Sequence, residues 1–302
     1  MSKPIKLILS QKQCIGDFAV LTAAIRDLHR LHPNRYITDV RVQLPVMRAI
    51  FDNNDYIKHV ADYDPEVRVI NCGYNMVHRS NQCGQHFITA FHETLSQELG
   101  VYLQCTEFKP DLYLTEEEMA DNLGVDEPYW IVNAGSKSDF TCKQSCTPHL
   151  QEAVDHLTQR RGLRFVQIGN SGDIHPNLSG VTNMIGKTTI RQLMSLVYHA
   201  KGIICPVTSV LHFSAGIPMP DGGLRPCVVL NGGREPVAWE QYPGMTFIDF
   251  IGKLDCCTTG ACWKAQIGVD CKNIEVVKGK AYPKCQVLTT PDKIINAVEN
   301  YL

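Results

Sequence analysis

Residues 5–33 read IKLILSQKQCIGDFAVLTAAIRDLHRLHP, and this stretch decides the fold. It begins with a short apolar run, Ile5–Leu9, which has the length of a buried strand. From Phe18 to His32 apolar side chains recur at steps of three and four residues, which predicts an amphipathic helix that Pro33 ends. A strand that leads through a short turn into a helix is the first half of a βαβ unit.

The same alternation of apolar runs and helical patterns continues along the chain, so the sequence predicts an α/β fold with mainly parallel sheets. The other expected strands are 40–44, 67–70, 112–114, 130–134, 165–168, 203–204 and 227–230. The other expected helices are 86–99, one that starts at the capping box of Thr115 and Glu118, 148–159, 189–199, 210–215 and one after Thr290-Pro291.

A break in this pattern at Gly124-Val125-Asp126-Glu127-Pro128 marks a domain boundary, because the alternation starts again at Trp130. A chain of 302 residues also has room for two domains of ordinary size. We therefore expect two Rossmann-like domains, residues 1–126 and residues 127–302.

Composition excludes several classes of function. The 29 Lys and Arg residues nearly balance the 31 Asp and Glu residues, so no overall field draws the chain to nucleic acid or anionic lipid. The N-terminus lacks the apolar stretch of a signal peptide, and no segment approaches the roughly 20 apolar residues of a membrane span. We expect a cytoplasmic protein, in which the 13 cysteines serve as metal ligands or free thiols rather than disulfides.

Asp17 is the first candidate for catalysis. It follows the first strand and opens the first helix, and ligands of open α/β folds bind at the carboxyl ends of such strands. Its carboxylate could accept a proton there. The alternative is structural, because Asp is also a favoured residue at helix N-termini.

Two turns that precede helices, and one further lysine, are candidate phosphate sites. The turn Gly186-Lys187-Thr188-Thr189 is not a P-loop, because Val181 stands where the P-loop glycine is required. The N–H groups of the following helix still favour an anion. Lys137, after the first strand of the second half, and Lys143 are similar candidates.

Five cysteines gather near the C-terminus: Cys256, Cys257, Cys262, Cys271 and Cys285. Thiolates concentrated in this way indicate a tetrahedral zinc or iron site, which we assign to the last four, with Cys256 as an alternative ligand. The spacing lacks the tight pairs of a zinc finger, so buried or reactive free thiols are the other interpretation.

The histidines form no catalytic triad or zinc-protease motif. His212 stands out by its position, because it lies in the helix that follows the 203–204 strand, with Thr208 and Ser209 just before it. A single histidine in such a place is more often structural.

Two blocks of the sequence resemble the family 9 glycosyltransferases, the heptosyltransferases of lipopolysaccharide synthesis. Residues 16–28, GDFAVLTAAIRDL, with His32-Pro33, resemble the N-terminal motif of that family. Residues 184–193, MIGKTTIRQL, followed by the 200–204 and 208–215 segments, resemble its donor-side motifs. The resemblance implies a GT-B architecture, in which the first domain binds the acceptor and the second the nucleotide-sugar.

By the same resemblance, Asp17 is the general base of an inverting transfer that needs no catalytic metal. The donor would be a nucleotide-diphosphate sugar such as ADP-heptose, and the acceptor a lipopolysaccharide sugar, a protein or a nucleic acid. The resemblance also implies the residues that contact the donor and its leaving diphosphate: Lys137, Lys143, Lys187, Thr188, Thr189, Thr208, Ser209 and His212.

The sequence departs from the family pattern in three places. Val207 stands where the family has an aspartate, and the family's K-x-W-P segment is here KQSCTP, residues 143–148. The cysteine-rich tail is absent from the lipopolysaccharide enzymes and resembles that of iron-binding protein heptosyltransferases. These departures leave two alternatives to an enzyme: an inactive nucleotide-sugar-binding protein, and a metal-organised docking surface for a macromolecule.

Overall fold

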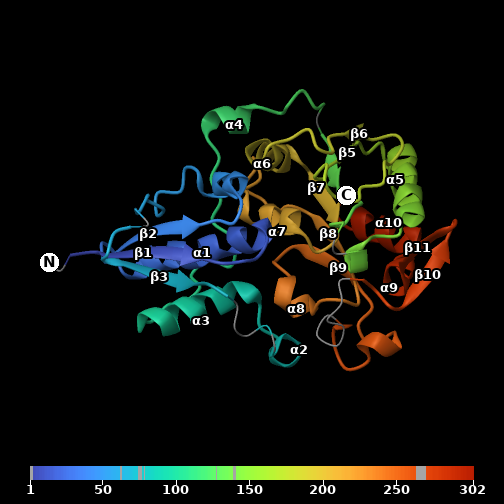
Figure 1. Cartoon of the computed structure of the whole chain (residues 1–302). Coiled ribbons are helices and arrows are strands. Elements are labelled where there is room, and N and C mark those ends of the chain that lie inside the picture. Colours follow the sequence, from blue (N-terminus) through green and yellow to red (C-terminus); the bar gives the residue numbers. More distant parts are fainter. Residues whose placement is uncertain are drawn as a thin grey trace.

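The computed structural model describes residues 3–61, 63–73, 77, 79–126, 128–138, 141–262 and 270–302. It contains two parallel sheets that lie side by side, one in each half of the chain (Figure 1). The first has the strand order β2-β1-β3 and the second the order β6-β5-β4-β7-β8-β9. The mainly parallel α/β fold expected from the sequence is therefore confirmed.

The first sheet forms as the opening stretch predicts. β1 (Ile5–Ser10) pairs in parallel with β2 (Tyr36–Arg41) and with β3 (Val67–Asn71). α1 (Ile15–Leu31) begins earlier than the apolar spacing indicates. The other helices of this half are η1 (Pro45–Phe51), α2 (Ser80–Cys83), α3 (Phe87–Leu99) and α4 (Glu116–Ala120).

Two expected strands of the first half are wrong. The strand predicted at 40–44 lies earlier, at Tyr36–Arg41, because residues beyond Arg41 leave the sheet and Pro45 opens a 3-10 helix. Residues 112–114 form no strand, since they run beside α1 and α7 instead of joining a sheet, and Leu112 packs on Gly216. The capping box of Thr115 and Glu118 is confirmed at the start of α4.

The second sheet has helices on both faces. Alternate residues of its central strands point to opposite sides, so that Ile131 and Ile203 join the core shared with α1, α6 and α7, while Val132 and Ile204 face α5 and α10. The strands are β4 (Trp130–Val132), β5 (Phe165–Gln167), β6 (Thr182–Asn183), β7 (Gly202–Cys205), β8 (Cys227–Gly232) and β9 (Met245–Asp249). The helical segments are η3 (Thr141–Lys143), α5 (Thr147–Arg161), α6 (Ile190–His199), α7 (Ser209–Gly216), α8 (Val237–Glu240) and α10 (Pro291–Glu299).

A cysteine-bearing segment follows β9 and leads into a small antiparallel hairpin. It contains η4 (Asp255–Cys257), β10 (Ile274–Val277), β11 (Lys280–Pro283) and α9 (Lys284–Val287). The periodicity of the sequence did not reveal this hairpin. In the described ranges, no helix is both long and apolar enough to cross a membrane.

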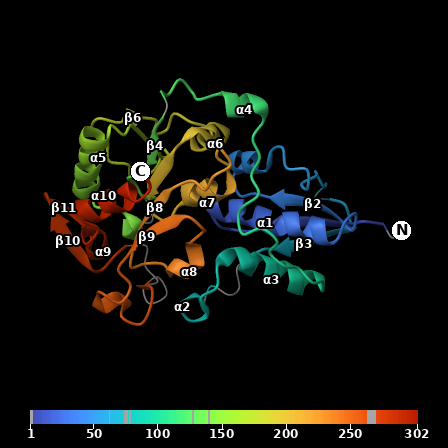
Figure 2. The ribbon, with the colours of Figure 1, turned by 180° about the vertical axis from the view of Figure 1, so that it is seen from behind.

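The two halves share one hydrophobic core. α1 and α7 lie against each other in both views, at the junction of the two sheets (Figure 2). Phe18 and Leu21 of α1 belong to the same buried cluster as Leu211 and Phe213 of α7. The division at residues 126 and 127 stays a prediction, and Glu127 lies outside the described residues.

Candidate active site

Asp17 lies in the first turn of α1, just beyond the carboxyl end of β1. Its Oδ2 atom accepts a hydrogen bond from the backbone N–H of Cys14 at 3.0 Å. This bond is half of a capping box, so Asp17 helps to start the helix. The side chain is only partly buried, which leaves both the structural and the catalytic interpretation open to it.

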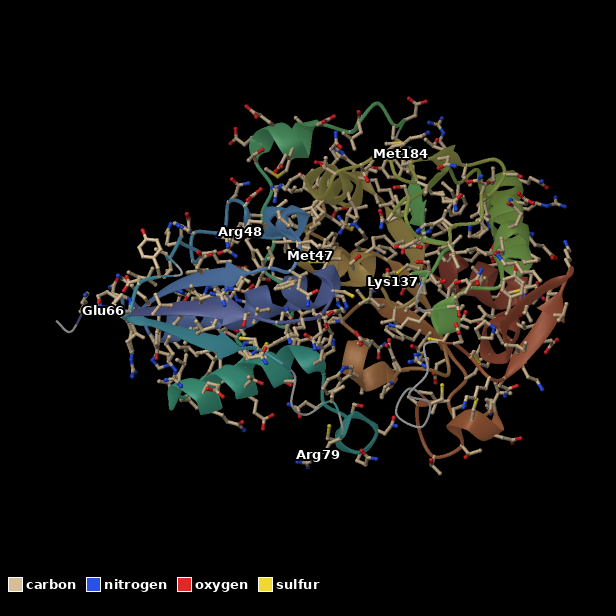
Figure 3. The ribbon with its side chains drawn as sticks, viewed as in Figure 1. Met47, Arg48, Glu66, Arg79, Lys137 and Met184 are labelled. Atoms are coloured by element: carbon tan, nitrogen blue, oxygen red, sulfur yellow. The ribbon has the colours of Figure 1, made fainter. Side chains whose placement is uncertain are left out.

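The first turn of α1 contacts the first turn of α7 because residue 16 is a glycine. A Cβ atom at Gly16 would lie 2.8 Å from Cδ2 of His212 and 3.2 Å from Cα of Ser209, closer than real Cβ atoms normally approach. Lys137, at the carboxyl end of β4, reaches the same place, since its Nζ atom lies 3.8 Å from Sγ of Cys14. Figure 3 shows Lys137 near the middle of the molecule. The fold therefore brings Asp17, Lys137, Ser209 and His212 together.

Lys143 belongs to this region but its charge is already compensated. Its Nζ atom donates to the carbonyl oxygen of Val207 at 3.2 Å and pairs with Oε1 of Glu235 at 2.7 Å. Burial acts to lower the pKa of Lys143, but the carboxylates of Glu235 and Glu240 outweigh it and raise that pKa. The lysine therefore stays charged at neutral pH, within a buried ion pair.

A second carboxyl group, Glu240 of α8, lies beside these residues. Its Oε2 atom is 3.7 Å from Nε2 of His212 and makes no hydrogen bond to any described residue. Burial raises the pKa of Glu240 well above its usual range, and the carboxylates of Glu235 and Asp17 raise it further. A buried carboxyl group of this kind favours its neutral, proton-carrying form.

His212 is buried and favours its neutral form. Its Nδ1 atom lies 3.2 Å from the hydroxyl of Tyr242, and its ring packs on that of Phe87. Burial lowers the pKa of His212 well below its usual range, and the charge of Lys143 contributes. Next to it, the hydroxyl of Thr208 at the N-terminus of α7 is buried and has no hydrogen-bond partner among the described residues.

The Gly186 turn occupies a different position. It follows β6, the edge strand of the second sheet, which is two strands away from β4. Nζ of Lys187 donates to the carbonyl oxygen of Asn183 at 2.7 Å, and the hydroxyl of Thr189 caps α6. In the part of the chain that the structure describes, no hydrogen bond or ion pair joins Lys187, Thr188 or Thr189 to the residues around Asp17.

The C-terminal cysteines surround a small cavity of about 10 Å³, the space of roughly one water molecule. Its walls include Cys142, Gly233, Arg234, Leu254, Cys256, Cys262, Cys271, Asn273 and Cys285. Cys257 is not among them, because its Sγ atom donates to the carbonyl oxygen of Phe250 at 3.4 Å. Cys146 is buried elsewhere.

The side chains that line the cavity suit a metal ion, but their sulfur atoms lie too far apart to bind one ion together. Five thiols face one small space, and burial raises the pKa of both Cys262 and Cys285 to about 12. A bound cation would have to overcome this preference for the protonated thiols. Among the described residues no three of these sulfur atoms lie within 4.8 Å of one another, so they must move closer together to bind one ion.

Asp27, His92 and Cys105 form the one described group whose ligand atoms lie close enough for a metal. Asp27 already accepts hydrogen bonds from Arg26, His92 and Thr106. Its carboxylate is fully buried and saturated by these donors. The group therefore acts as a structural network of the first half.

Comparison with solved structures assigns the fold. The glycosyltransferase family 9 protein of Veillonella parvula superposes with a TM-score of 0.67 at 14% identity, covering 100% of this chain and 98% of its own. E. coli ADP-heptose lps heptosyltransferase II gives 0.63 at 12% identity, with 98% of each chain covered. The iron-containing dodecameric heptosyltransferase TibC, in complex with ADP-D-β-D-heptose, gives 0.68 at 14% identity over 100% of this chain and 77% of its own.

This chain has the GT-B fold of the family 9 glycosyltransferases. The sequence itself matches no protein-family model and no curated protein. At these identities the family 9 fold is established by the shape of the whole chain, and not by shared residues.

Sequence reasoning missed four residues that lie in or beside this candidate site: Arg234, Glu235, Glu240 and Tyr242. Arg234 and Glu235 follow the carboxyl end of β8 just as Lys137 follows that of β4. The strand-end rule that singled out Asp17 could have found them. Glu240 and Tyr242 carried no such signal, because Glu240 ends a short helix that periodicity does not predict, and Tyr242 lies two residues beyond it.

Proposed function

We propose that this chain is a family 9 glycosyltransferase that transfers a sugar from a nucleotide-diphosphate sugar to an acceptor hydroxyl. One observation carries the proposal: Asp17 stands at the N-terminus of α1, where that helix meets the first turn of α7 and Lys137 of the second half. A candidate base and candidate groups for a leaving diphosphate thus face each other across the junction.

In the proposed reaction, Asp17 takes the proton of the acceptor hydroxyl as its oxygen attacks the anomeric carbon. The leaving diphosphate departs from the opposite face, and the configuration inverts. Lys137 supplies positive charge, while the Thr208 hydroxyl and the N–H groups of α7 supply hydrogen bonds to the developing charge. Glu240 keeps its proton and so adds no second negative charge near Asp17.

An ADP-linked heptose is the donor we favour, because the solved heptosyltransferases of this fold include TibC with ADP-D-β-D-heptose. The assignment rests on the fold and not on a described base pocket. The acceptor in this proposal is a hydroxyl group of a lipopolysaccharide sugar, a protein or a nucleic acid.

Nucleotide binding tests the proposal first. ADP, UDP, GDP and an ADP-sugar are each added to the full chain, and its thermal unfolding is followed. A ligand at a hundred times its Kd adds about 2.7 kcal/mol, which raises the Tm of a protein of this size by several degrees. We expect a clear rise with ADP and the ADP-sugar and a smaller one with the others. A Tm that no nucleotide changes would contradict the proposed function.

A protein that binds a nucleotide-sugar without catalysis is the second candidate. The observation that favours it is the Lys143–Glu235 pair, which compensates the lysine that resembles the family's diphosphate ligand, together with Val207 in place of the family aspartate. Such a protein would raise its Tm with ADP but transfer no sugar, with or without Asp17.

We also propose that the cysteine cavity holds one zinc or iron ion as a structural group. TibC is an iron-containing enzyme of the same fold, and here the thiols line a cavity with room for a single ion. Metal analysis of the purified full chain should find about one equivalent. A content below about a tenth of an equivalent, after growth with both metals supplied, would reject the metal site.

A further inference from the structure

Cys142 places a thiol from a distant part of the chain in the wall of the cysteine cavity. It belongs to η3, whereas the other four thiols of the cavity lie beyond β9. The neighbouring Thr141 hydroxyl donates to the Asp270 carboxylate, which attaches η3 to the cysteine-bearing segment. The contact between these two parts of the chain therefore does not rest on Cys142 alone.

Two adjacent pairs of residues connect the cavity to the site around Asp17. Cys142 lines the cavity, while its neighbour Lys143 pairs with Glu235. On the other side of that ion pair, Arg234 lines the cavity next to Glu235 in the chain. Because the Cα atoms of neighbouring residues are only 3.8 Å apart, a backbone shift at Cys142 also moves the backbone of Lys143, and one at Arg234 moves that of Glu235.

The charges in the cavity suit bound thiolates. Arg234 is 7% exposed and lines the same cavity as the Cys142, Cys262 and Cys271 thiols. Four thiolates around a divalent ion carry a net charge of about −2. A buried guanidinium beside them offsets half of that charge, and such neighbours are what orient metal ligands.

The same segment is also bound to the first half of the chain. The side chain of Asn81 in α2 donates to the carbonyl oxygen of Ala261 at 3.0 Å and accepts from its N–H at 2.9 Å. Ala261 directly precedes Cys262, which lines the cavity. The segment that carries Cys262 is therefore attached to both halves of the chain.

We infer that Cys142 is a ligand of the metal ion in the cysteine cavity, and that this ligation positions the Lys143–Glu235 pair, whose lysine holds the Val207 carbonyl next to Thr208 of the donor site. The inference rests on the proposed function for its donor site and on the proposed metal for its ion. Cys142 and Arg234 are positioning residues in this scheme, because they act through Lys143 and Glu235.

The experiment compares Cys142→Ser with Cys146→Ser in the full chain. Cys146 is the matched control, since it is an equally buried thiol four residues on that does not line the cavity. Metal content is measured by mass spectrometry, and ADP affinity by calorimetry. We expect Cys146→Ser to keep about one equivalent of metal and the wild-type Kd. Cys142→Ser should lose most of its metal and bind ADP about tenfold more weakly.

A Lys143→Met variant tests whether metal binding acts on ADP affinity through Lys143. It should weaken ADP binding while it keeps a full equivalent of metal, because Lys143 does not line the cavity. If Cys142→Ser does not fold, removal of the metal from the wild type with a chelator, with circular dichroism to check the fold, gives the same comparison. Loss of metal should again raise the Kd for ADP about tenfold.

The outcomes separate this inference from the proposals beneath it. Full metal content and unchanged ADP affinity in Cys142→Ser would overturn it, and so would loss of metal with unchanged affinity. A wild type without metal would overturn it together with the metal site. A wild type that binds metal but no nucleotide would reject the proposed function and the positioning role, and metal content in Cys142→Ser would still decide the ligand.

Discussion

Replacing Asp17 by asparagine is expected to lower kcat for sugar transfer by about 10²–10⁴-fold, the usual contribution of a general base. Asparagine has nearly the same shape and cannot take up the acceptor proton. Its side-chain oxygen can still accept the hydrogen bond from the Cys14 N–H, so α1 should start as before. The Kd for the nucleotide should stay within about twofold, because the role of Asp17 is assigned to the acceptor.

The control for this variant is Asp126→Asn, whose side chain is 92% exposed. It should change neither kcat nor the Kd. A wild-type rate in Asp17→Asn, with wild-type thermal stability, would leave Asp17 with its capping role alone. A wild type that binds ADP but transfers no sugar to any acceptor tried would favour the binding protein over the enzyme.

Much of the fold could be predicted because its signals are local. The apolar spacing in residues 18–32, the glycine after α3 and the capping box at Thr115 each act within a few residues of the element they define. The hairpin of β10 and β11 was missed for the opposite reason. Its strands are largely exposed, with Ile274 and Val276 more than half exposed, so they lack the apolar alternation of a half-buried strand.

The candidate site could be predicted where it lies at a strand end or matches a family motif. Asp17 and Lys137 were found from strand ends and Ser209 from the family resemblance, and the structure brings the three together. The strand-end rule could have found Glu235, but not its pairing with Lys143, because the two residues are remote in sequence. The place of Cys142 in the cysteine cavity follows from the packing of η3 against the later segment, which sequence spacing does not show.

Cys256 and Cys257 show that sequence spacing does not decide which thiol lines the cavity. The two are neighbours in the sequence, and the predicted ligand set took Cys257 with Cys256 as the alternative. In the structure the 3-10 helix η4 turns the two side chains to different places, so that Cys256 lines the cavity and Cys257 bonds to Phe250. The ligand set of the proposed site is therefore better drawn from Cys142, Cys256, Cys262, Cys271 and Cys285.

The largest effect on stability is expected at Asp27, which joins α1 to α3 and to the segment that leads out of the first half. Its carboxylate accepts from Arg26 Nε at 2.9 Å, from the His92 ring at 2.8 Å and from the Thr106 N–H at 3.0 Å. Burial alone would raise the pKa of Asp27, but hydrogen bonds from His92, Arg26 and Thr106 outweigh burial and hold that pKa well below its usual range.

Asp27→Ala leaves Arg26 buried, with 0% of its side chain exposed and with only the Asp111 carboxylate, 3.8 Å from its Nη1 atom, as a charged partner. Breaking a buried pair in this way costs about 3–5 kcal/mol, whereas Asp126→Ala on the surface should change the free energy of unfolding by less than about 0.5 kcal/mol. Urea unfolding of the three proteins measures both values. A loss below about 1 kcal/mol in Asp27→Ala would mean that the network contributes little.

The pH dependence gives an independent check with a fixed sign. Because the pKa of Asp27 is lower in the folded protein than the roughly 3.9 of an unfolded carboxyl, its stabilisation is complete above that value and is lost as the pH falls below it. The wild type and Asp27→Ala should therefore differ most in the free energy of unfolding near neutral pH, and the difference should shrink below about pH 4. A difference that stays constant down to pH 3 would show that lost packing, and not the ionised carboxylate, accounts for the effect.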